Sequence, residues 1–92
     1  MSDDMNAIIK SEFRELAIKT RDRLGLTQSK MAEGLTMNEA SYSVIESGVY
    51  KCGTLTAILL LIMQEDPREF LQKIRQRFDA LQKSYEEEEP EQ

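Results

Sequence analysis

The sequence predicts an all-α fold, and three observations support this. Its 92 residues contain only two prolines, Pro67 and Pro90, so long stretches are free to form helix. β-branched residues nowhere alternate with polar ones over a sustained run, which argues against strands. Apolar residues recur instead at spacings of three and four, which is typical of helices with a buried face. We therefore expect a small five-helix domain with an extended C-terminal helix.

The first helix is expected to run from near Asp4 to Leu24, with Gly25 ending it. Its apolar residues recur at helical spacing: Ile9, Phe13, Leu16, Ala17 and Leu24.

Two short helices follow. Thr27 is placed to cap a second helix that ends near Gly34, because its hydroxyl can accept a backbone N–H of the first turn. Asn38 is expected to cap a third helix over residues 39–47, and Gly48 to end it.

The fourth helix is predicted from Leu55 to about Gln64, with Thr54 as its cap. It is apolar on opposite faces, one formed by Leu55, Ile58, Leu59 and Ile62, the other by Leu60, Leu61 and Met63. Because a helix that is apolar all round must be covered on both sides, we expect two different contacts for it.

The fifth helix is expected to begin at Asp66-Pro67, with a cap and a proline in the first turn. A continuous apolar stripe runs along it: Phe70, Ile74, Phe78, Leu81 and Tyr85. The resulting division of the chain is a flexible acidic arm (1–6), a helix-turn-helix domain (7–64), a C-terminal amphipathic helix (65–85) and an acidic disordered tail (86–92).

Composition argues against catalysis. The chain has no His and a single Cys52, so the usual general base, the usual zinc ligand and an intramolecular disulfide are all missing. No catalytic set stands out, so we expect a non-enzymatic, cytoplasmic protein without a metal or cofactor. The longest apolar run, residues 57–63, is seven residues, far below the ~20 that cross a bilayer, so no membrane partner is expected.

The net charge of −5 is unevenly distributed. Residues 1–9 and 84–92 contain seven Asp or Glu and no Lys or Arg. Residues 10–83 contain twelve Lys or Arg against ten Asp or Glu, which leaves +2. Because the field near a binding face depends on local charge, the body of the chain suits a nucleic-acid partner better than the total suggests.

Two short helices joined by three or four residues have the outline of a helix-turn-helix. The residues Leu26-Thr27-Gln28, Met31-Ala32, Tyr42 and Ile45-Glu46-Ser47-Gly48 resemble the phage-repressor-like XRE/Cro-type helix-turn-helix family. The resemblance runs ungapped from about Arg21 to Gly48 and continues, after a slightly shorter connector, to Ile62. It implies a lambda-repressor-like domain of bacterial or phage origin. It also implies a DNA-binding transcriptional regulator, a repressor that binds a palindromic operator as a dimer.

The resemblance also assigns structural roles. Ala32 would sit where the two motif helices cross, and Arg21 and Glu46 would form a partly buried ion pair. Met31, Leu35, Tyr42 and Ile45 would point inward. Thr36 stands in the turn where family members usually have Gly, and a β-branched residue resists a left-handed backbone. We therefore expect this turn to be rearranged around Gly34.

The resemblance implies that Gln28 hydrogen-bonds a phosphate of the DNA backbone and that the third helix reads bases in the major groove. On that helix Asn38 would address adenine and Glu39 the cytosine amino group, while Ala40 and Val44 would touch a thymine methyl. Ser41 and Ser43 would reach bases or phosphates, and basic support comes from Lys30 and Lys51, with Arg23 as an addition.

We expect a homodimer whose interface is formed by Leu60, Leu61, Phe70, Ile74, Phe78 and Leu81. The alternative is that the fifth helix folds back over Leu60 and Leu61 within one subunit, and both arrangements can hold at once. The alternative function is an antitoxin-like or antirepressor-like module on the same fold, with a toxin or another regulator as partner. A reading helix without Arg, Lys or Gln favours that alternative, and Gln28 with a net-positive body favours double-stranded DNA.

Overall fold

The computed structural model describes residues 2–49 and 52–87, and this part of the chain is helical, without a strand. The five helices are α1 (Ser2–Leu24), α2 (Gln28–Gly34), α3 (Glu39–Ser47), α4 (Thr54–Ile62) and α5 (Pro67–Glu87). The prediction of an all-α chain with an extended last helix is confirmed at this level.

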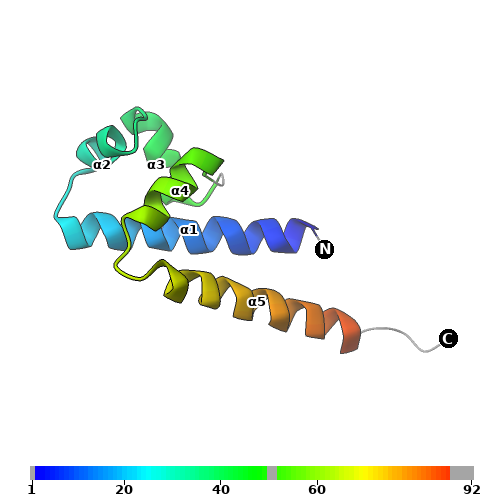
Figure 1. Cartoon of the computed structure of the whole chain (residues 1–92). Helices are drawn as coiled ribbons and strands as arrows, with labels where there is room; N and C mark the ends of the chain where they lie inside the picture. Colours follow the sequence, from blue (N-terminus) through cyan, green and yellow to red (C-terminus); the bar gives the residue numbers. More distant parts are fainter. Residues whose placement is uncertain (1, 50–51, 88–92) are drawn as a thin grey trace.

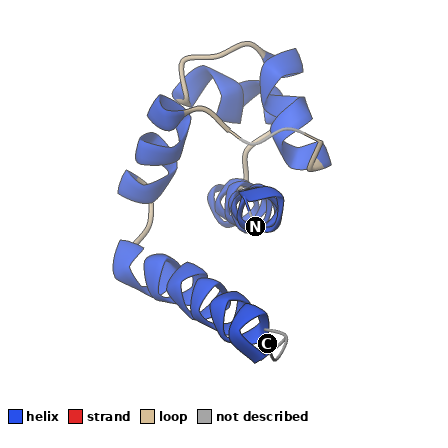
Figure 2. Cartoon of the chain, turned by 90° about the vertical axis from the view of Figure 1, so that its right-hand side faces the viewer, coloured by secondary structure: helices blue, strands red, loops and turns tan. Residues whose placement is uncertain are grey.

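Helix α1 is the central element. Helices α2, α3 and α4 lie on one side of it, and α5 runs antiparallel to it on the other (Figure 1). Viewed along α1, helices α3 and α4 lie at different positions around its axis (Figure 2). The faces of α3 and α4 that point away from α1 are therefore separate surfaces.

The core gathers on α1. Phe13, Leu16 and Ala17 are buried on it, and the ring of Phe13 meets Phe70 of α5 edge to face at 4.9 Å between centroids. The remaining core residues come from every other helix and from Leu35 beside α2: Met31, Ala32, Leu35, Tyr42, Ile45, Leu60, Phe70 and Ile74. The predicted inward positions of the motif are thus confirmed.

The predicted caps are largely correct. The Thr27 hydroxyl accepts the N–H of Lys30 at 3.1 Å, and the Asn38 side chain accepts the N–H of Ser41 at 2.8 Å. Gly48 ends α3 in the left-handed region, with φ of 80°. The prediction for α4 was wrong at both ends, because Gly53 is its cap, Thr54 is already helical, and the helix stops at Ile62.

The ends of the chain also differ from expectation. Residues 2–6 continue α1 instead of forming an arm, and Asp3 and Asp4 in its first turn favour this because carboxylates interact well with a helix N-terminus. The Tyr85 hydroxyl donates to the Asp4 carboxylate, which joins this turn to α5. At the other end, Glu86 and Glu87 belong to α5. The rest of the expected acidic tail lies outside the described residues.

Candidate nucleic-acid interface

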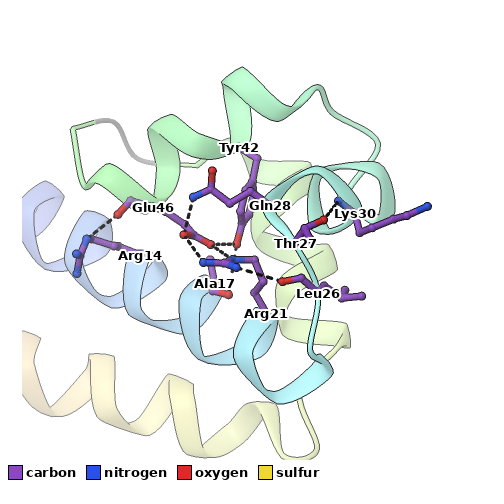
Figure 3. Close-up of polar contacts among 9 residues, drawn as sticks. All are labelled: Arg14, Ala17, Arg21, Leu26, Thr27, Gln28, Lys30, Tyr42 and Glu46. Atoms are coloured by element: carbon purple, nitrogen blue, oxygen red, sulfur yellow. Dashed lines mark hydrogen bonds and ion pairs between the residues drawn. The ribbon is translucent and has the colours of Figure 1, made fainter.

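The carboxylate of Glu46, in the last turn of α3, joins three elements (Figure 3). Arg21 of α1 donates to it twice, from Nε to Oε2 at 2.6 Å and from Nη2 to Oε1 at 3.1 Å. A third Arg21 bond, from Nη1, reaches the carbonyl of Leu26 at 3.1 Å. The predicted ion pair is confirmed, and its two-pronged geometry fixes the end of α3 against α1.

Gln28 and Tyr42 complete the same cluster. The Gln28 Nε2 donates to Glu46 Oε1 at 2.9 Å, and the Tyr42 hydroxyl donates to Oε2 at 2.5 Å. Gln28 is the first residue of α2, so this contact ties α2 to α3 directly. Sequence reasoning missed it, because the spacing of 18 residues reflects tertiary packing and no local rule.

The protonation of the cluster follows from these contacts. Burial alone would raise the pKa of Glu46, but the hydrogen bonds from Arg21, Tyr42 and Gln28 outweigh it and lower the pKa below its ordinary value. Burial, together with the neighbouring carboxylate, raises the pKa of the Tyr42 hydroxyl. The hydrogen bond to Glu46 raises the pKa of Arg21. The cluster is therefore a charged pair with a neutral tyrosine at neutral pH.

Arg14 is a functional candidate that sequence reasoning missed. Its Nε donates to the backbone carbonyl of Glu46 at 2.8 Å, which places a cation at the C-terminal end of α3. Gly48 leaves room for it, since a Cβ there would lie 3.0 Å from the Arg14 Cδ. A signal existed: Arg14 lies two helical turns before Arg21, on the same face of α1.

The turn between α2 and α3 contradicts one prediction. Thr36 itself takes the left-handed conformation, with φ of 58°. Gly34 is the last residue of α2, and its φ is not positive. The Thr36 hydroxyl donates to the carbonyl of Leu35 at 2.6 Å, and the N–H of Met37 reaches back to the carbonyl of Ala32 at 3.0 Å. The geometry of the turn is thus kept at the cost of strain at Thr36.

The leading end of α3 is open to solvent. Asn38, Glu39, Ala40 and Ser41 are exposed, and Ser43 and Val44 are half-buried. The Asn38 Oδ1 accepts the N–H of Ser41 in capping α3, so the amide is oriented by its own helix, which disfavours the bidentate contact that adenine needs. The outward surface is therefore a small, mostly neutral face with Glu39 as its one carboxylate.

The basic candidates are dispersed. Lys30 is exposed on α2 and lies 3.5 Å from Glu33, and Lys51 is outside the described residues. Arg23 donates to the carbonyl of Met63 at 2.8 Å, at the end of α4. In the described ranges 2–49 and 52–87, Arg14 and Arg21 are the cations that hydrogen-bond directly to α3, and Arg21 is engaged with the buried Glu46 carboxylate.

The residues predicted for dimerisation divide into two groups. Leu60, Phe70 and Ile74 are buried in the chain's own core, and Leu61 and Phe78 are half-buried against it. Leu81 is half-buried farther along α5. Helix α5 does fold back within the subunit, but onto α1. Periodicity could not tell which apolar face of α4 turns inward.

None of the family models, curated proteins or solved structures compared with the chain matches it. Within residues 2–49 and 52–87, no group of three or more Cys, Asp or Glu is placed to hold a metal ion. No helix in that part of the chain has the length and apolar character to span a membrane.

Proposed function

We propose that the chain is a sequence-specific DNA-binding transcriptional regulator, a repressor of the XRE/Cro type that binds a palindromic operator as a dimer. The observation that supports this proposal is the way in which α3 is fixed to the rest of the domain. Its inner face is fixed to α1 and α2 through Glu46, while the residues of its leading end are exposed. A short helix held rigidly at its rear with an open front is the arrangement that major-groove reading requires.

In this role the exposed residues of α3 read base edges. Glu39 accepts from the cytosine amino group, and Ala40 contacts a thymine methyl. The small side chain of Ala40 lets the helix backbone approach the groove closely, and the hydroxyl of Ser43 reaches a base or a phosphate. No group at this surface has to perform chemistry, so binding alone accounts for regulation.

Gln28 positions the backbone of the DNA. One N–H of its amide is engaged by Glu46, and the second is available to a phosphate oxygen. Lys30 and Arg14 add charge on either side of α3. Because each subunit offers few cations to phosphates, the affinity should depend only weakly on salt concentration. A dimer doubles the number of phosphate contacts and therefore this dependence.

The test is selection from genomic DNA. The full chain is incubated with fragments of its own genome at about 0.15 M salt, and the bound DNA is sequenced. We expect a few enriched palindromes, whose binding is weakened about tenfold or more by Glu39→Ala or Ser43→Ala. Glu65→Ala, an exposed carboxylate in the α4–α5 connector, is the matched control. A folded chain that enriches nothing contradicts the proposal.

A second candidate function is a protein-interaction module of the antitoxin or antirepressor kind. The observation that favours it is the exposed leading end of α3, which offers Glu39 and neither Arg nor Lys to DNA. Such a module would bind a protein partner in place of DNA or in addition to it. If the genomic selection is empty, recovery of one defined partner from lysate, lost in Glu39→Lys, would support this function.

A further inference from the structure

Among residues 2–49 and 52–87, no element covers the outer face of α4. Leu55 is 62% exposed, Ile58 49% and Ile62 70%, whereas Leu60 on the inner face is fully buried. The nine residues of α4 include no charged side chain. Exposed aliphatic residues are common singly, but three on one uncharged helix mark an interaction surface.

These three residues form one stripe, which we call the α4 stripe. Their spacing of three and then four residues places them on the same side of the helix, opposite the buried Thr56 and Leu60. Seven residues at 1.5 Å each give the stripe a length of about 10 Å. It is long enough to form the core of a helix-to-helix contact.

We propose that a second copy of the chain covers the α4 stripe through a two-fold contact between antiparallel α4 helices. The stripe is nearly symmetric about Ile58, with Leu55 three residues before it and Ile62 four residues after. A two-fold axis beside Ile58 therefore sets Leu55 against Ile62 of the second copy, and each Ile58 against the other. Such self-matching is what an isologous interface needs.

The chemistry of the stripe also favours a second copy over a different protein. Apart from Thr54, the outward side chains of α4 have neither charge nor hydrogen-bonding group with which to select a dissimilar partner. At the C-terminal end of α4, the bond from Arg23 to the Met63 carbonyl joins the end of α1, where the next residue, Leu24, is 43% exposed. The exposed side chain of Leu24 can contribute to the buried area of the interface, which in a stable dimer is roughly 800 Å² per partner.

The inference rests on the dimeric part of the proposed function, and it places the dimer contact on α4 and not on α5. Because α3 and α4 lie at different positions around α1, their outer faces are separate, and the contact leaves the exposed face of α3 free (Figure 2). The two copies would therefore associate before DNA is present, through residues that do not read bases.

The test is the mass of the full chain in solution, measured by sedimentation equilibrium from about 1 μM to about 1 mM. We expect a dimer that Leu55→Lys or Ile62→Glu converts to monomer, with a dissociation constant raised at least about tenfold. Leu71→Lys is the matched control, since Leu71 is also apolar and 49% exposed but lies on α5. Circular dichroism confirms that each variant is folded, and Leu55→Gln and Ile62→Gln replace any charged variant that is not.

Mixing the two variants tests the pairing itself. A Leu55→Lys chain and an Ile62→Glu chain should form a heterodimer, because the antiparallel register sets the new lysine against the new glutamate. Three outcomes would each overturn the inference. The wild-type chain is monomeric at every concentration, the dimer is lost only in Phe78→Glu, or the mixture of the two variants stays monomeric. DNA binding is scored in the same samples. A dimer that binds no DNA then refutes DNA binding and leaves the α4 contact standing. A monomer that binds DNA refutes the α4 contact and the dimeric part of the proposed function, and leaves DNA binding standing.

Discussion

The amide of Gln28 donates to the carboxylate of Glu46 at 2.9 Å, and this bond links the first residue of α2 to the last turn of α3. Arg21 holds the same carboxylate from α1. The two helices of the proposed DNA-binding unit are therefore oriented by one buried acid and not by the turn alone. Loss of that acid should disturb stability and recognition together.

Removing Arg21 should be costly. In Arg21→Ala the Glu46 carboxylate remains buried with only neutral donors, so we expect the free energy of unfolding to fall by about 3 kcal/mol. Urea unfolding measures this. The control is Arg75→Ala, which breaks an exposed pair with Asp79 and should cost less than about 1 kcal/mol. Similar losses in both variants would show that the buried pair has no special role.

Acid should weaken the fold partly through Glu46. Its pKa is lower in the folded chain than its ordinary value near 4.5, so the unfolded chain binds the proton more readily. The stability from this carboxylate is thus complete above about pH 4.5 and is lost as the pH falls through the folded-state pKa. Glu46→Gln, which cannot ionise, should be less stable at pH 7 and lose less stability between about pH 5 and about pH 3. Parallel stability profiles for the two proteins would contradict this.

Local signals explain which features could be predicted from the sequence. Thr27, Asn38 and Gly48 act on backbone groups within four residues of themselves, so their roles follow from residue type and position. The orientation of α4 did not follow, because its opposite faces are equally apolar and only packing on α1 selects Leu60. The bond from Gln28 to Glu46 likewise joins residues that no periodicity relates.

Thr36 shows a different limit of local reasoning. The steric rule that disfavours a left-handed threonine is correct, but the hydrogen bonds of the turn outweigh the strain. Thr36→Gly should remove roughly 1–2 kcal/mol of strain against about 0.5–1 kcal/mol of added chain entropy. We therefore expect the variant to be more stable by about 0.5–1 kcal/mol, with a higher midpoint in thermal unfolding.

Two glycine variants calibrate that result. Gly48→Ala should lower stability by about 1–2 kcal/mol, because φ is 80° and the new Cβ meets Arg14 at 3.0 Å. Gly34→Ala has open space and an ordinary helical backbone, so a small gain of up to about 1 kcal/mol is expected. If Thr36→Gly were as destabilising as Gly48→Ala, the strain assigned to Thr36 would be refuted.

The docking of α5 depends on Glu12, a carboxylate buried on α1. Arg77 donates to its Oε2 at 2.6 Å, and Lys73 lies 3.4 Å from its Oε1. Arg77→Ala leaves this carboxylate buried with Lys73 alone, so we expect a loss of about 2 kcal/mol in urea unfolding. Lys73→Ala should cost less than about 1 kcal/mol, since this longer pair is half exposed on the lysine side.

Replacing both partners, in Glu12→Leu with Arg77→Leu, should recover most of the stability lost in Arg77→Ala, because no buried charge then remains. A double variant less stable than Arg77→Ala would show that the ion pair itself, and not the burial of apolar surface around it, holds α5 on α1.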